Sequence, residues 1–288
     1  MRSDQLAVDE AGGAAPMDVV PPARIAKLTL DVGVRKCNLA FVPLLSLAIL
    51  AGAFIAFGAM FYTITITGST LGFGPTRLLG GLAFSLGLVL IVIGGAELFI
   101  GNSLIVLARI EGLVTTSELM RNWGIVYVGN LIGALGIAAL VYASGVLTLG
   151  NGEVANTVIA IASGKVALNP LQAFTRGILC NTLVCLAVWM CFAAHTVTGK
   201  IFAIVFPIAA FVSLGFEHSV ANMYLLPVAG LLEPSATTLQ GMVMNLLPVT
   251  LGNVVGGGLF VGTAYWLIYV RRSAPEVPQA PSDSARQY

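Results

Sequence analysis

The chain has 288 residues and a mean hydropathy of +0.93, and only 9% of its residues are charged. A soluble domain carries about 25% charged residues, so the composition excludes an ordinary water-exposed surface and indicates that lipid surrounds much of the protein. The formal net charge of +1 excludes the broad basic field of a nucleic-acid-binding protein.

Long apolar runs predict an all-α polytopic membrane protein, because about 20 apolar residues span a membrane as a helix. Before the first run, residues 1–35 are polar, with an amphipathic helix expected around 23–35, and they lack the apolar core of a cleaved signal peptide. After the last run, residues 273–288 are polar and proline-rich and are expected to be disordered. Residues 36–272 form the transmembrane domain, with six predicted spans at 39–66, 78–110, 123–149, 171–194, 201–232 and 241–270.

Lysine and arginine are unevenly divided between the two sides of this predicted topology. Eleven fall on the side that holds both chain ends, and three, Arg77, Lys165 and Arg176, fall on the other. Positively charged loops stay in the cytoplasm, so both termini are predicted to be cytoplasmic, in a bacterial cytoplasmic (inner) membrane. Two ends on one side require an even number of spans, which six satisfies.

The second and fifth predicted spans carry glycine and acid near their middles. Gly94 and Gly95 precede Glu97 in the second span, which is also too long for one straight crossing, and Gly215 precedes Glu217 in the fifth. Irregular backbone survives inside a membrane only where protein or a water-filled cavity covers it. Both spans are therefore predicted to be broken, as in proteins that carry a transport site between two halves.

Two patterns recur in the halves of the chain. Glu97–Asn102 and Glu217–Asn222 share E-x-x-x-x-N, 120 residues apart, and G-N-x-x-G at 129–133 recurs at 252–256, 123 residues on. These patterns predict a duplication of three spans, and an odd number of spans requires the repeats to be inverted. The first and fourth spans show no convincing match. The asparagines expected to support the broken backbone are Asn102, Asn130 and Asn253.

Glu97 and Glu217 are the only acids well inside the spans. A charge in hydrocarbon is costly unless it is paired or solvated, so we expect each carboxylate to cap the second half of its broken helix by accepting free backbone N–H groups. A proton relay is the alternative. His218 points about 100° away from Glu217 on a helix, and an imidazole group can donate or accept a proton near neutral pH. It is the leading functional candidate, with a satisfied core histidine as the alternative.

Phenylalanines flank both breaks, with Phe84 and Phe99 in the second span and Phe211 and Phe216 in the fifth. Rings at helical spacing usually pack, which is the favoured interpretation, but in a pore they would narrow the lumen and strip a permeant ion of water. Lys165 lies in a polar stretch before the fourth span, either as a solvated loop lysine or as an anion attractor at the outer mouth.

Five segments resemble the formate/nitrite transporter family: GGAELFIGN (94–102), NWGIVYVGNLIGA (122–134), ILCNTLVCLAVWM (178–190), GFEHSVANM (215–223) and NLLPVTLGNVVGGGLFVGTAYWLIY (245–269). The likeness covers about residues 24–272. It implies an aquaporin-like protomer of six spans and a homopentamer in the lipid membrane with one pore per protomer. The pore or substrate residues it implies are His218, Lys165, Asn181 and Asn222, and the constriction residues are Phe84, Leu88, Phe99 and Phe211. A further asparagine of the family falls on Asn253.

One position departs from the family's pattern. Members that conduct formate usually have a threonine directly after the phenylalanine at the break of the second span. Here that residue is Ile100, so the hydroxyl that would meet His218 is missing. Asn102 and Ser103 are the nearby polar residues considered as its replacement.

The resemblance implies passage of formate, either passive or proton-coupled. Lys165 and the dipoles of half-helices would concentrate the anion, and phenylalanine rings would form a waist that a hydrated anion crosses only at high cost. His218 would donate a hydrogen bond or a proton there. Nitrite, hydrosulfide or another small monocarboxylate is the alternative substrate.

A different class of function, a membrane haem protein using His195 and His218, is disfavoured because the two histidines fall at different depths of different spans. The four cysteines form no CxxC or CxxH pair, so no metal site or cofactor is expected. Ser219 beside His218 is too weak a pattern for a hydrolase, and the chain is not predicted to be an enzyme.

Overall fold

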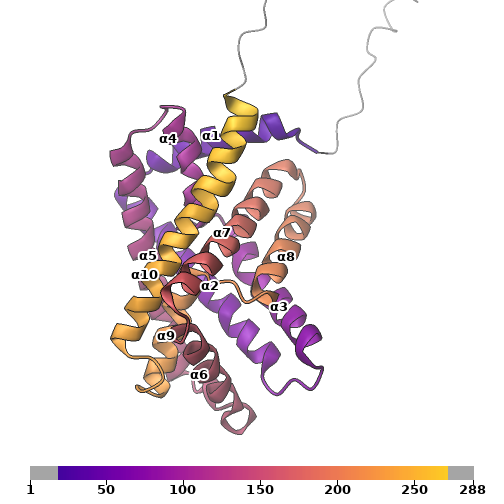
Figure 1. Cartoon of the computed structure of the whole chain (residues 1–288), viewed down its shortest axis with the longest axis vertical. Helices are drawn as coiled ribbons and strands as arrows, with labels where there is room; N and C mark the ends of the chain where they lie inside the picture. Colours follow the sequence, from indigo (N-terminus) through magenta and orange to yellow (C-terminus); the bar gives the residue numbers. More distant parts are fainter. Residues whose placement is uncertain (1–18, 272–288) are drawn as a thin grey trace, which may run out of the picture.

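The computed structural model describes residues 19–271, and every regular element within that range is a helix (Figure 1). The all-helical class predicted from composition is therefore confirmed. The predictions for residues 1–18 and for the tail 273–288 lie outside the described residues. The helices are α1 (Pro22–Cys37), α2 (Phe41–Ile66), α3 (Phe73–Gly94), η1 (Gly101–Ile105), α4 (Val106–Ile110), α5 (Thr116–Ala143), η2 (Val146–Thr148), η3 (Gly150–Gly152), α6 (Glu153–Val166), α7 (Pro170–Ala193), α8 (Val197–Ser213), α9 (Ser219–Leu232), α10 (Leu239–Val255), η4 (Gly256–Thr263) and η5 (Trp266–Val270).

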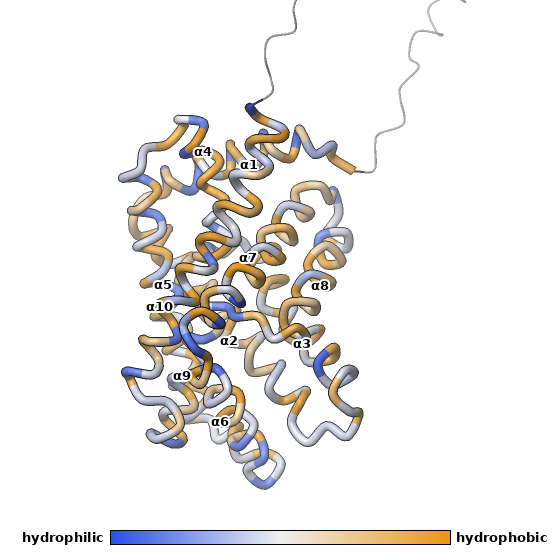
Figure 2. Tube along the Cα trace, viewed as in Figure 1, coloured by the Kyte–Doolittle hydropathy of each residue, from blue (hydrophilic) through white to orange (hydrophobic). Residues whose placement is uncertain are grey.

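Five of the described helices are long and apolar enough to cross a membrane: Phe41–Ile66, Phe73–Gly94, Thr116–Ala143, Pro170–Ala193 and Leu239–Val270. The last combines α10 with η4 and η5, which continue it in wider π-type turns. Large apolar side chains such as Phe57, Phe206 and Leu251 are exposed along the helices. Figure 2 shows the same hydrophobic character over most of the bundle, with hydrophilic stretches at its two ends and at mid-height. Such a surface suits lipid and is unfavourable in water.

The two ends of the described chain lie at the same end of the bundle (Figure 1). α1 lies across that end beside α4, and η5 finishes next to it, whereas α6 lies at the opposite end. α1 covers the region around 23–35 where an amphipathic helix was predicted, and its Ile25, Ala26 and Leu30 are buried.

Several element boundaries differ from the sequence prediction. The third predicted span begins at Thr116 rather than near 123, because Thr115 and Glu118 form a capping box that starts α5 about two turns earlier. The polar stretch before the fourth span is not a loop. It forms α6, and Lys165 lies in its last turn.

Two helices end at left-handed glycines in the middle of the sequence regions predicted to be broken. α3 ends at Gly94 and is followed by Gly95 with φ 79°, and α8 ends at Ser213, two residues before Gly215 with φ 73°. A side chain is strained at these angles, so glycine is the favoured residue for stopping a helix this way. Helical structure resumes only at η1 and at α9.

Glycines also set the distance between helices. A Cβ at Gly52 or Gly133 would overlap backbone atoms of the facing helix, so α2 and α5 meet backbone to backbone. Gly177 and Gly252 do the same for α7 and α10. Small residues at helix contacts replace the hydrophobic driving force that is absent between helices in lipid.

Candidate functional site

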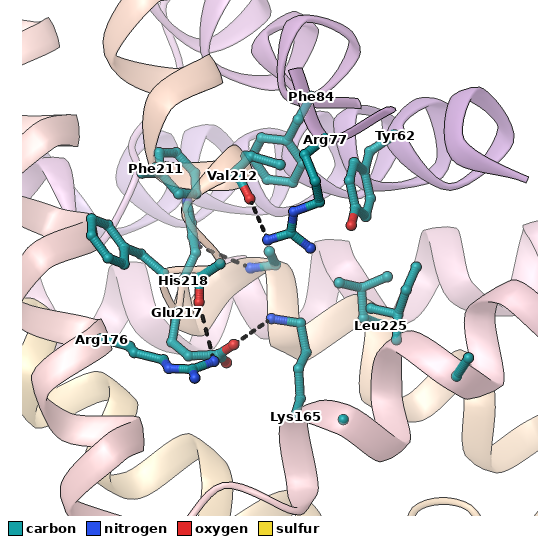
Figure 3. A pocket seen from close by; sticks show the side chains of 16 residues that line it. Tyr62, Arg77, Phe84, Lys165, Arg176, Phe211, Val212, Glu217, His218 and Leu225 are labelled. Atoms are coloured by element: carbon teal, nitrogen blue, oxygen red, sulfur yellow. Dashed lines mark hydrogen bonds and ion pairs between the residues drawn. The ribbon is translucent and has the colours of Figure 1, made fainter. Parts of the chain in front are cut away.

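A cavity of about 300 Å³ lies beside α6, and we call it the α6 cavity (Figure 3). Its inner wall is buried and combines His218 and Glu217 with the rings of Phe84 and Phe211. Its partly exposed lining carries Arg77, Lys165 and Arg176. The cavity therefore leads from charged side chains to an imidazole that lies beside two aromatic rings.

A second cavity, of about 440 Å³, lies beside α1 at the other end of the bundle, and we call it the α1 cavity. Lys36, Glu97 and Asn102 line it. So does Leu88, which follows Phe84 of the α6 cavity by four residues on α3. Four residues of α-helix rise about 6 Å, so a short apolar section of α3 separates the two cavities.

Lys36 is the centre of a buried polar network at the first helix break, by which we mean the non-helical segment between α3 and η1. Its Nζ donates to Glu97 Oε2 at 2.9 Å and to Asn102 Oδ1 at 2.8 Å. Asn102 Nδ2 donates to the same Glu97 oxygen and to Asn122 Oδ1. Asn122 Nδ2 donates back to the Lys36 carbonyl. The carboxylate is thus both charge-paired and hydrogen-bonded, which is what a buried charge requires.

A similar network surrounds the second helix break, the non-helical segment between α8 and α9. Lys165 Nζ donates to Glu217 Oε1 at 2.9 Å, and Asn222 Nδ2 donates to Glu217 Oε2 at 2.7 Å. Asn222 also donates to Asn245 Oδ1, and Asn245 Nδ2 donates to the Lys165 carbonyl. The second network thus repeats most of the hydrogen bonds of the first. Its lysine, Lys165, corresponds to Lys36, 129 residues earlier, in the region where the sequence showed no match.

Two asparagines hold the broken backbone itself. Asn130 Nδ2 donates to the carbonyls of Ala48 and Glu97, and its Oδ1 accepts the Phe99 N–H at 2.9 Å. The same three bonds recur in the other half: Asn253 Nδ2 to the Gly177 and Glu217 carbonyls, and Ser219 N–H to Asn253 Oδ1. Each of these two asparagines thus forms hydrogen bonds with three backbone groups.

The expectation that the glutamates cap the second half-helices is wrong. The oxygens of Glu217 are occupied by Lys165 and Asn222, and those of Glu97 by Lys36 and Asn102. α9 is instead capped by His218, whose Nδ1 accepts the Ala221 N–H at 3.2 Å. The lysine that competes for each carboxylate comes from a distant helix, so local spacing gave no sign of it.

Asn181 connects the first break to α10. Its Nδ2 donates to the Ile100 carbonyl at 2.9 Å, to Ser103 Oγ and to the Asn253 carbonyl. A Cβ at Gly257 would collide with this group. Ile100 is fully buried, and neither Ser103 nor Asn102 forms a hydrogen bond to His218. The two residues considered as substitutes for the missing threonine are thus engaged elsewhere.

Three aromatic rings gather at the inner wall of the α6 cavity. The centroids of Phe84 and Phe211 are 5.6 Å apart, and the His218 ring lies 6.1 Å from Phe84 and 5.9 Å from Phe211. Phe99 is not among them. Its ring packs edge-on against Tyr127 at 4.9 Å and Trp123 at 6.1 Å. The position of His195, exposed between α7 and α8, also separates it from His218 and disfavours a shared haem.

Residues that the sequence analysis did not single out complete the site. Asn122 and Asn245 each precede the supporting asparagine of their half by eight residues, a repeated spacing that could have identified them. Lys36 carried no such local signal. Arg77 and Arg176 were counted only for their charge, and it is the fold that brings both to the α6 cavity.

Replacing Asn253 with alanine should lower the free energy of unfolding by about 3 kcal/mol, because three buried backbone groups lose their partner. Asn253→Asp should be at least as destabilising, because its carboxylate keeps the acceptor for the Ser219 N–H but loses both donors and places a buried charge against the Gly177 and Glu217 carbonyl oxygens. The unfolding midpoint in a denaturing detergent titration reports the change. A midpoint for Asn253→Ala equal to that of the wild type would contradict this assignment.

The fold and the site together define a class of protein. An all-helical bundle with a lipid-compatible surface has two cavities at opposite ends, each lined in part by charged side chains and separated by apolar ones, which is the organisation of a membrane channel or transporter. The chain belongs to the formate/nitrite transporter family, whose family model matches residues 23–267.

Comparison with known proteins places several formate channels among its relatives. The formate channel FocA of Escherichia coli strain K12 is 40% identical over 277 residues, covering 90% of this chain and 97% of that protein. A probable formate transporter of Methanothermobacter thermautotrophicus is 40% identical over 267 residues, covering 87% and 97%. A solved pentameric formate channel with formate bound has a TM-score of 0.74 at 43% identity, covering 81% of this chain and 98% of that one. An FNT family ion channel has a TM-score of 0.79 at 29% identity, covering 85% and 98%.

Proposed function

We propose that this protein is a formate channel that conducts the anion across the cytoplasmic membrane past His218. The similarity to formate channels over most of the chain supports the substrate class. The observation that carries the proposal is the position of His218, whose ring lies beside the rings of Phe84 and Phe211 at the inner wall of a cation-lined cavity.

The proposed architecture is an aquaporin-like bundle of six spans with both termini in the cytoplasm. In it, α3 with η1 and α4 forms the broken second span, and α8 with α9 forms the broken fifth. The two described chain ends at one end of the bundle and the two cavities at opposite ends support an inverted three-plus-three repeat. The matching hydrogen bonds of the two halves support it as well. By similarity to a pentameric channel, we also propose a homopentamer.

The hydrogen bond at His218 Nδ1 determines what the imidazole offers to an anion. Because Nδ1 accepts the Ala221 N–H, the neutral ring carries its proton on Nε2. Nε2 has no hydrogen-bond partner among the described residues, and the ring lines the α6 cavity. The N–H group there is a donor for a carboxylate oxygen.

This geometry favours hydrogen-bond donation over proton transfer. A neutral ring cannot surrender its only N–H proton to formate, and the doubly protonated ring would lose the cap to Ala221, since both nitrogens then donate. The anion would therefore cross the apolar section as a hydrogen-bonded carboxylate. Phe84 and Leu88 on α3 line the approach from the two cavities, which excludes bulk water and restricts passage to small anions.

Formate flux into proteoliposomes at several pH values tests the proposal, with empty vesicles as the baseline. His218→Ala removes both the donor and the helix cap, and we expect at least about a tenfold loss of flux, the equivalent of one hydrogen bond to a charged group. His218→Asn is the matched variant, because asparagine caps helices well and offers an amide donor but does not titrate. Hydrogen-bond donation predicts that His218→Asn keeps most of its flux.

Loss of flux in both variants, together with a wild-type flux that follows imidazole titration, would instead indicate proton transfer. Competition by nitrite, hydrosulfide and acetate in the same vesicles ranks the alternative substrates. A wild-type flux of formate no higher than in empty vesicles would refute the proposed function.

A further inference from the structure

All three lysine and arginine residues assigned to the α6 end of the bundle line one cavity. Arg77 comes from α3, Lys165 from α6 and Arg176 from α7, and all three point into the α6 cavity (Figure 3). Residues from three helices that are far apart in sequence thus converge on the mouth of the cavity that His218 lines. The question is which of these charges remains available to an anion.

The charge of Lys165 is already compensated. Its Nζ lies 2.9 Å from Glu217 Oε1, and the two side chains are only 15% and 4% exposed. The pair is therefore locally neutral. Glu217 is the only acid that lines the cavity, so it can neutralise one cation and not three.

Arg77 and Arg176 are held by backbone carbonyls instead of by acids. Arg77 donates from Nε to the Ser213 carbonyl and from Nη2 to the Val212 carbonyl, both at 3.0 Å. Arg176 donates from Nη1 to the Gly215 carbonyl at 3.4 Å. Within residues 19–271, no carboxylate oxygen lies within 4.0 Å of either guanidinium. Each guanidinium has five N–H donors, so several remain free.

We infer that Arg77 and Arg176, rather than Lys165, form the anion-recruiting site at the mouth of the α6 cavity. The inference rests on the proposed function and assigns the charge that selects for anions within it. Two uncompensated charges beside a low-dielectric wall raise the local concentration of small anions, and planar guanidinium groups suit carboxylates and other small oxyanions. Lys165 acts as a positioning residue that holds Glu217.

Arg176→Gln is the informative substitution, because Arg176 makes one long hydrogen bond whereas Arg77 holds the end of α8. In proteoliposomes, Arg176→Gln should raise the half-saturating formate concentration about threefold or more at low ionic strength, while the maximal rate stays close to wild type. The difference should shrink when potassium gluconate raises the ionic strength to about 150 mM, because salt screens the guanidinium charge. Arg176→Lys should behave like wild type.

Arg121→Gln is the matched control. Arg121 also donates to backbone carbonyls, those of Cys37 and Leu39, but it lines neither cavity, so its loss should leave the half-saturating concentration unchanged. An Arg176→Gln channel that saturates at the wild-type concentration at both ionic strengths would overturn the inference.

Broadening of the ¹³C-formate resonance by the detergent-solubilised protein provides a readout that does not require transport. We expect weaker broadening with Arg176→Gln than with wild type or Arg176→Lys, and equal broadening in all three would also overturn the inference. Binding without any wild-type flux would count against the proposed function alone, so the two failures are distinguishable.

Discussion

Glu217→Gln is expected to lower the free energy of unfolding by about 3–5 kcal/mol, the usual cost of removing one partner from a buried ion pair. The substitution keeps the shape of the side chain and one acceptor oxygen, so it mainly removes charge. Lys165 is then left without compensation, with a side chain only 15% exposed. It also shares the α6 cavity with Arg77 and Arg176, so three cations of like charge would face one another without an acid.

The double variant Glu217→Gln with Lys165→Met separates charge from shape. If the uncompensated lysine causes the loss, removing its charge should restore much of the stability, as hydrophobic replacement of whole buried ion pairs often does. The unfolding midpoint in a denaturing detergent titration, measured for wild type, both single variants and the double variant, gives the coupling energy of the pair. Additive effects of the two substitutions would show that the ion pair does not contribute in this way.

The internal repeat shows how far the sequence alone could lead. The patterns around Glu97 and Glu217 and around Asn130 and Asn253 were visible because they involve buried polar residues in otherwise apolar runs. The matching roles of Lys36 and Lys165 were not visible, because both residues lie at helix ends that read as polar connections. In the first and fourth predicted spans, Asn130 and Asn253 donate to the carbonyls of Ala48 and Gly177. Every residue has a backbone carbonyl, so the sequence could not indicate which ones serve as these partners.

The helix cap at His218 shows a second limit. The sequence indicated that Glu217 and His218 are adjacent residues directly before the second half of a broken helix, and that one of them would cap that half. Which one does so depends on competition for the carboxylate by Lys165, 52 residues away, and by the side chain of Asn222. Because Lys165 binds the acid, the histidine takes the cap, and its remaining nitrogen is left for the cavity. The tautomer on which the proposed mechanism depends therefore follows from a tertiary contact.

The two halves also differ in a way that concerns function. Leu98 precedes the Phe99 N–H that Asn130 accepts, as His218 precedes the Ser219 N–H that Asn253 accepts. The α1 cavity thus has a leucine where the α6 cavity has an imidazole. The two halves share the same kind of backbone support, and the difference between leucine and histidine at this position gives only one of them a hydrogen-bond donor near the middle of the bundle.

Gly133→Ala on α5 should prevent recovery of folded protein, whereas Gly136→Ala on the same helix should not. A Cβ at Gly133 would overlap the carbonyl oxygen of Ile49 and lie 2.9 Å from the backbone N of Ala53, while a Cβ at Gly136 would meet nothing within 4 Å. Backbone atoms of a helix cannot turn aside as a side chain can, so relief requires α2 and α5 to separate. Overpacking usually costs about 1–3 kcal/mol, and a clash between two backbones should exceed that range.

The separation would also disturb the site. Asn130 lies one turn before Gly133 and donates to the Ala48 carbonyl of α2 at 2.8 Å while accepting the Phe99 N–H at the first helix break. Moving α5 away from α2 would break this connection, so a small amount of Gly133→Ala protein that did fold should conduct less formate than Gly136→Ala protein. Size-exclusion chromatography after detergent extraction measures the folded yield, and flux per reconstituted protein measures the rest. Equal yield and equal flux for the two variants would mean that close contact between α2 and α5 is not what holds the first break in place.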